Sequence, residues 1–115
     1  MAEEPPELTE AFGIVSVRKD DDTVAVSPRG ELDVSTSPRL VACIENLLAE
    51  GRSRIILDLD SVTFIDSSGL GALVKAHKRA VQLSAEVTVI KPRPHVHRAM
   101  EISGILRVIR VEGTD

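Results

Sequence analysis

The sequence predicts an α/β sandwich, in which helices pack against a mixed β-sheet. Short β-rich segments alternate along the chain with amphipathic segments of helical spacing, and such alternation is typical of a sheet covered by helices. The first two β-rich segments lie close together and predict a hairpin, whereas later strands are separated by helices and favour parallel pairing. The 115 residues, 43% of them hydrophobic, suffice for one core.

The predicted domain covers residues 11–115, and residues 1–10 are expected to form a disordered acidic tail. Four glutamates and two prolines fill this tail, so it cannot bury enough apolar surface to offset the entropy lost on ordering. The remaining residues hold 14 acidic and 14 basic side chains and two phenylalanines. A neutral body with so few aromatic rings argues against nucleic-acid binding.

The predicted cellular location of the protein rests on its single cysteine and on the length of its apolar runs. One cysteine cannot form an internal disulfide. No apolar run approaches the roughly 18 residues that a membrane span needs, and the acidic start is unlike a secretory signal. The sequence therefore predicts a cytoplasmic protein without a membrane segment.

The first half of the chain contains four predicted elements. Alternating apolar residues at 12–17 and a β-rich segment at 23–26, with three aspartates between them, predict the hairpin. Ser37-Pro38 begins a helix over about 37–50, and Gly51 stands where a C-terminal cap belongs. The apolar run at 54–59 predicts a buried central strand.

The second half contains two more helices and two more strands. Apolar residues at helical spacing predict a helix from Ser67 or Ser68 to Leu83. A strand at 86–90 precedes a helix at about 95–102 that ends at Gly104, and a strand at 105–111 closes the chain. The predicted order is β-β-α-β-α-β-α-β.

Known signatures of catalysis and metal binding are missing. Gly69 and Gly71 lack the third glycine of a dinucleotide site, and no Gly-Lys-Ser follows. His95 and His97 point to different faces of a helix and have no partner ligands. Cys43 neighbours an apolar stripe, where a thiol acts as a small hydrophobe. The sequence thus predicts no enzyme, no catalytic residue, no metal and no bound cofactor.

Asp66-Ser67-Ser68-Gly69 stands between the predicted central strand and the second helix, and two interpretations remain open. One is ordinary N-capping by an aspartate or serine. The other is a phosphorylation site, because a helix N-terminus tolerates the −1.5 to −2 charges of a phosphoserine and a glycine keeps the approach open. The surrounding acids would form either a surface for a basic partner or a solvated rim; they are Glu31, Asp33, Asp58, Asp60 and Asp66.

Three segments, residues 30–40, 56–59 and 62–71, resemble the STAS-domain anti-anti-sigma factors of bacteria, of the SpoIIAA and RsbV kind. The resemblance spans about residues 12–111, and Phe-Ile-Asp-Ser-Ser-Gly-Leu is its most specific part. Two stretches depart from the family pattern: Ser84-Ala85-Glu86 replaces a glycine-rich turn, and residues 91–95 are unusually basic.

The resemblance implies partner switching. The unphosphorylated form would bind an anti-sigma factor that is also a serine kinase with a histidine-kinase-like ATPase fold, and would thereby release the sigma factor. That kinase, which holds the ATP and Mg²⁺, would phosphorylate Ser67, and a metal-dependent phosphatase would reverse the reaction. The partner-binding residues implied by position are Glu31, Asp33, Asp66, Ser67, Ser68 and Gly69.

A second hypothesis is a non-switching STAS scaffold or accessory subunit of a stress-signalling or transport complex, in which Ser67 is never phosphorylated. The two differ in whether partner binding depends on phosphorylation. The oligomeric state stays open, and the neutral body and short chain favour a monomer.

Overall fold

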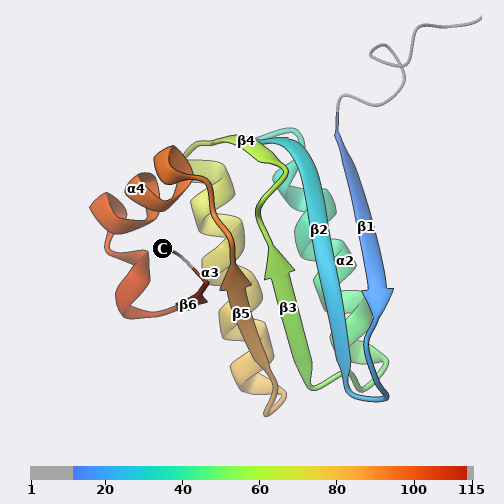
Figure 1. Ribbon diagram of the computed structural model, residues 1–115. Helices are drawn as coiled ribbons and strands as arrows, with labels where there is room; N and C mark the ends of the chain where they lie inside the picture. Colours follow the sequence, from blue (N-terminus) through green and yellow to red (C-terminus); the bar gives the residue numbers. More distant parts are fainter. Residues whose placement is uncertain (1–11, 114–115) are drawn as a thin grey trace, which may run out of the picture.

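The computed structural model describes residues 12–113 and confirms the α/β sandwich (Figure 1). The predicted tail over residues 1–10 lies outside the described residues. Within residues 12–113 the elements are β1 (Gly13–Arg18), β2 (Thr23–Leu32), α2 (Ser37–Ala49), β3 (Arg54–Asp58), β4 (Val62–Ile65), α3 (Ser67–Gln82), β5 (Glu86–Ile90), α4 (Pro94–Ser103), the 3-10 helix η1 (Ile105–Arg107) and β6 (Arg110–Glu112).

The sheet is mixed, as predicted. Its strand order is β1-β2-β3-β5-β6, and β4 pairs with β2 beside this path. β1 and β2 form the antiparallel hairpin, and all other pairs are parallel. The ten-residue β2 pairs with β3 near its start and with β4 at its end, where the register shifts between Gly30 and Glu31.

The core lies between one face of the sheet and the helices α2 and α3, which Figure 1 shows behind the sheet. Alternate strand residues point toward these helices because successive side chains of a strand face opposite sides. The buried strand residues include Val24, Val26, Ile55, Leu57, Val87 and Val89, and the buried helix residues include Leu40, Ile44, Leu48, Leu73, Ala76 and Ala80. Within residues 12–113, no helix is long and apolar enough to span a bilayer.

The predicted helix ends are largely confirmed. Pro38 stands in the first turn of α2, and Gly51 follows its end with a φ of 94°. Gly104 ends α4 in the left-handed conformation, with a φ of 83°. Thr36 is the N-cap residue of α2, but its side chain does not cap the helix. Its hydroxyl donates instead to the Glu31 carbonyl, at 2.6 Å.

Two parts of the predicted element order are wrong. β4 was not predicted as a strand, because four residues in parallel register give too short a pattern to recognise. The predicted strand at 105–111 is η1 followed by the three-residue β6. Ile105 and Ile109 are both buried, and their spacing of four residues is that of a helical turn.

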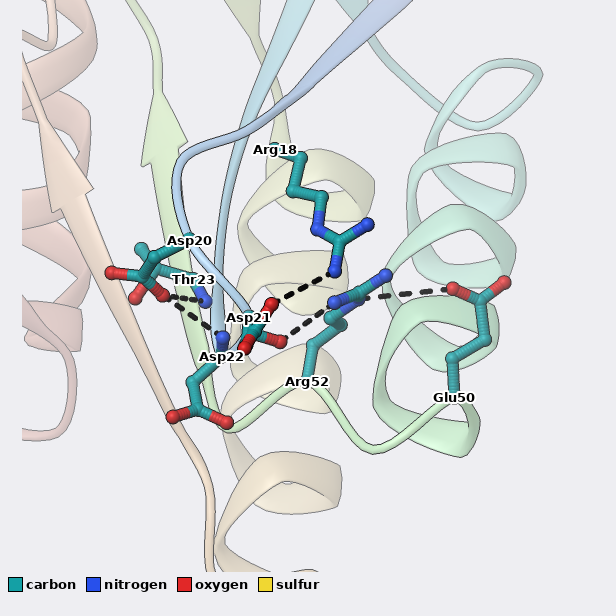
Figure 2. A network of polar contacts seen from close by, with 7 residues as sticks. All are labelled: Arg18, Asp20, Asp21, Asp22, Thr23, Glu50 and Arg52. Carbon is teal, nitrogen blue, oxygen red and sulfur yellow. Dashed lines mark hydrogen bonds and ion pairs between the residues drawn. The ribbon is translucent and has the colours of Figure 1, made fainter.

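A network of polar contacts stabilises the turn between β1 and β2 (Figure 2). Asp20 Oδ1 accepts the backbone N–H of Thr23 at 2.8 Å, and the Arg18 guanidinium lies 3.0 Å from Asp21 Oδ1. Arg52, from the loop between α2 and β3, donates to the Asp21 carbonyl at 2.6 Å. These contacts hold the β1–β2 turn against the loop between α2 and β3. They lie at the start of β2, whereas β2 pairs with β4 at its other end.

Candidate functional site

Ser67 is the first residue of α3, and Asp66 is the N-cap residue before it. Asp66 Oδ1 accepts the backbone N–H of Ser68 at 2.9 Å and that of Gly69 at 3.1 Å. The capping interpretation is therefore right for Asp66. Ser67 is exposed, and its hydroxyl makes no hydrogen bond to any residue between 12 and 113. A free hydroxyl at a helix N-terminus is chemically available for phosphorylation.

Gly69 lies differently from the sequence expectation. It is buried, and a Cβ added there would stand 2.6 Å from both the Leu32 carbonyl oxygen and Ile65 Cγ1. Gly69 thus lets α3 approach the ends of β2 and β4 closely. Gly69 therefore has a packing role, and its predicted role in partner binding stays a prediction.

The loop after β2 is held beside this helix start. The backbone N–H of Asp66 donates to the Leu32 carbonyl at 3.2 Å, so Leu32 joins the two segments. Glu31 and Asp33 flank Leu32 and line one shallow pocket. The structure therefore brings the predicted residues Glu31 and Asp33 to the same end of the sheet as Asp66 and the start of α3.

Asp33 organises its own loop. Its Oδ1 accepts the Ser35 hydroxyl at 2.8 Å, the Ser35 backbone N–H at 3.0 Å and the Thr36 backbone N–H at 3.1 Å. These bonds favour the ionised carboxylate, and the one from the Ser35 hydroxyl contributes most to lowering the pKa of Asp33. Asp33 thus has a structural role in addition to the charge it places near α3.

Two exposed apolar side chains, not predicted from the sequence, lie at this end of the molecule. Val34 is 74% exposed in the loop after β2, and Phe64 is 46% exposed on β4, where it pairs with Glu31. Exposed apolar groups rimmed by charges are typical of protein-binding surfaces. Their sequence signal is weak, since Val34 is a lone apolar residue in a polar loop and β4 is short.

A groove of about 430 Å³ adjoins the start of α3. It runs between α2 and α3, and its lining includes Pro38, Val41, Ala42, Ser68, Gly71 and Ala72. The predicted residue Ser68 is half-buried and faces this groove rather than open solvent. The surface around Ser67 therefore combines acidic, apolar and concave parts.

The remaining polar candidates hold neighbouring turns in place. Asp58 accepts the Asp60 backbone N–H at 2.9 Å, and the Asp60 carbonyl accepts Arg93 Nε at 2.7 Å. His95 Nε2 lies 2.6 Å from the Thr63 carbonyl and so links α4 to β4. No cluster of three or more His, Cys, Asp or Glu side chains suited to a metal ion occurs in the part of the chain that the structure describes.

The fold and the helix start at Ser67 belong to a small α/β domain, and comparison with known proteins identifies its family. A family model described as "STAS domain" matches residues 15–114, and the chain belongs to this family. The anti-sigma-B factor antagonist of Staphylococcus aureus is 32% identical over 96 residues, which cover 83% of this chain and 89% of that protein.

Solved structures agree on the fold. The crystal structure of an anti-sigma factor antagonist from Mycobacterium paratuberculosis superimposes with a TM-score of 0.79 at 22% identity, over 97% of this chain and 92% of that one. The Bacillus protein SpoIIAA in its phosphorylated form gives a TM-score of 0.68 at 21% identity, over 86% and 90% of the two chains. The resemblance predicted from the sequence is thereby confirmed.

Proposed function

We propose that this chain is an anti-sigma factor antagonist whose binding is switched off by phosphorylation of Ser67. The unphosphorylated protein binds an anti-sigma factor that is also a serine kinase, and the sigma factor is released. The names of the curated relatives support the antagonist role. The observation that carries the switch is the exposed Ser67 hydroxyl, free of hydrogen bonds within residues 12–113, beside a cap that Asp66 already supplies.

The physical basis of the switch is electrostatic. A phosphate on Ser67 adds −1.5 to −2 charges at the N-terminus of a 16-residue helix, whose dipole stabilises an anion locally. The fold is therefore expected to survive modification. The surface formed by Glu31, Asp33 and Phe64, which we call the docking surface, is expected to change more. Glu31 and Asp33 already make it acidic, so a phosphate would add like charge. The exposed Phe64 offers an apolar contact, which a nearby phosphate and its bound water would weaken.

In this proposal the chain is a binding module and a kinase substrate rather than an enzyme. ATP and Mg²⁺ belong to the partner kinase, of the histidine-kinase-like ATPase fold, and a metal-dependent serine phosphatase restores the binding form. The partner-binding set is Glu31, Asp33, Asp66, Ser67 and Ser68, extended by Val34 and Phe64 from the structure. The protein would act in the bacterial cytoplasm, where sigma factors bind RNA polymerase.

The test uses immobilised wild type, Ser67→Ala and Ser67→Asp as baits in lysate of the source bacterium. We expect wild type and Ser67→Ala to retain an ATPase that Ser67→Asp loses. With Mg-ATP, the retained ATPase should phosphorylate wild type and the control Ser16→Ala, whose serine is exposed on β1, but not Ser67→Ala. Equal retention by all three baits, with no phosphate on Ser67, would contradict the switch and favour a non-switching scaffold.

A further inference from the structure

β1 is an outer strand of the sheet, and one of its edges is unpaired within the described residues. It pairs with β2 on one side, and no other strand within residues 12–113 pairs with its second edge. The free N–H and C=O groups of such an edge are a template for another strand. Figure 1 shows β1 at the margin of the sheet, with no helix in front of β1, β2 and β3.

The open edge carries one charged side chain, Arg18 at the end of β1, and few of the other features that usually prevent strand addition. Residues 13–17 include no charged residue and no proline, and the pairing with β2 continues through six residue pairs without a register shift. Val15 is 60% exposed and Val17 49% exposed. Proteins normally protect outer strands with charges, prolines, bulges or short length.

The opposite margin of the sheet is protected. β6 has three residues, and two of them, Arg110 and Glu112, form an ion pair with Nε and Oε2 2.9 Å apart. A short, charged strand is a poor template for pairing. Of these two margins, β1 is therefore the one that is better suited to strand addition.

We infer that β1 is a self-association surface whose occupant is β1 of a second copy of this chain. Antiparallel pairing about a two-fold axis uses the same edge in both copies, so the contact closes as a dimer and does not propagate. With Ser16 opposite Ser16 of the second copy, Val15 of each copy lies opposite Val17 of the other. Cross-strand pairs of β-branched side chains on one face stabilise antiparallel strands.

The valines face the uncovered side of the sheet. Val15 pairs with Ser27 and Val17 with Ala25, whereas their neighbour Ser16 pairs with the buried Val26. The dimer would therefore continue the sheet and cover apolar area on its open face. The contact is a single pair of short strands, so we expect a weak dimer that forms only at high protein concentration.

Sedimentation equilibrium of the full chain, from micromolar to millimolar concentration, tests the inference without any anti-sigma factor. The average mass should rise from 12.4 kDa toward twice that value. The variant with both Val15→Lys and Val17→Lys should stay monomeric, while the control Val81→Lys, whose valine is 59% exposed on α3, should dimerise like wild type. A wild type that stays monomeric at millimolar concentration, or a double variant that dimerises equally, would overturn the inference.

Disulfide formation tests the register, in a Cys43→Ala background. Directly opposite residues of an antiparallel pair have Cα atoms about 4.5–5.5 Å apart, within the range of a disulfide. Ser16→Cys should therefore cross-link to itself on oxidation. Val15→Cys alone should not, because its copies are offset by two residues, but it should cross-link with Val17→Cys. Self-linking of Val15→Cys at the rate of Ser16→Cys would refute this register.

Discussion

Replacing Gly69 with alanine tests whether this glycine is a packing residue. The new methyl group would stand 2.6 Å from the Leu32 carbonyl oxygen, a backbone atom, so β2 or α3 must shift. Overpacking of this kind costs about 1–3 kcal/mol, and alanine regains up to about 1 kcal/mol of helix propensity. We expect a net loss of about 1–2 kcal/mol in the free energy of unfolding.

Gly71→Ala is the matched control. Gly71 lies two residues further along the same helix, and a Cβ added there would have no atom within 4 Å. Only the propensity gain applies, so this variant should be as stable as wild type or up to about 1 kcal/mol more stable. The two alanine variants should thus differ by about 2 kcal/mol.

Thermal unfolding followed by circular dichroism measures both variants. A loss of 1 kcal/mol lowers the Tm of a domain of this size by roughly 4 °C, so Gly69→Ala should melt about 4–8 °C below wild type. Urea unfolding supplies the free energies directly. Equal stability of Gly69→Ala and Gly71→Ala would refute the close approach of α3 to Leu32 and return Gly69 to the docking surface.

Three further predictions follow from the caps and titratable groups. Asp66→Ala should lower the free energy of unfolding by about 0.5–2 kcal/mol in urea, because the cap bonds to Ser68 and Gly69 disappear. Asp66→Ser should keep most of the wild-type stability, because serine also caps helices. Equal loss in the two variants would argue against capping. The lowered pKa of Asp33 means that its carboxylate stabilises the folded state at pH values above the ordinary pKa of 3.8, and this stabilisation is lost as the pH falls through the folded-state pKa. Asp33→Asn should therefore reduce the fall of Tm at acidic pH. An unchanged fall of Tm would contradict this role of Asp33. Burial raises the pKa of the Cys43 thiol above 9.0; its reaction with a thiol reagent should be slower than that of free cysteine at pH 8, and an equal rate would refute this.

The sequence predicted those elements whose signals are local. The hairpin, the three helices and the strands at 54–58 and 86–90 each have a period or a cap within their own residues. β4 has neither, because it exists through its parallel pairing with the end of β2, about thirty residues earlier in the chain. η1 was missed because a strand and a helical turn of this length share an apolar composition.

The residues of the candidate site also differ in whether their sequence signals are local. The position of Ser67 at a helix start could be predicted from its four-residue motif, since capping is a local interaction. The burial of Gly69 could not, because it depends on Leu32 and Ile65, which belong to strands that the sequence did not pair. Phe64 was missed for the same reason: its exposure depends on β4.

In the proposed switch, the arrangement at Ser67 would separate stability from signalling. Asp66 supplies the cap, Gly69 supplies the close packing, and the Asp66 backbone bonds to Leu32, so the helix start is held by groups other than the Ser67 side chain. A phosphate on Ser67 would then break no hydrogen bond among residues 12–113 and displace no core atom. Its charge would act outward, on the acidic and apolar surface formed by the loop after β2 and by β4. A residue so placed can change a binding affinity by orders of magnitude at little cost in folding free energy, and that combination is what a reversible partner switch requires.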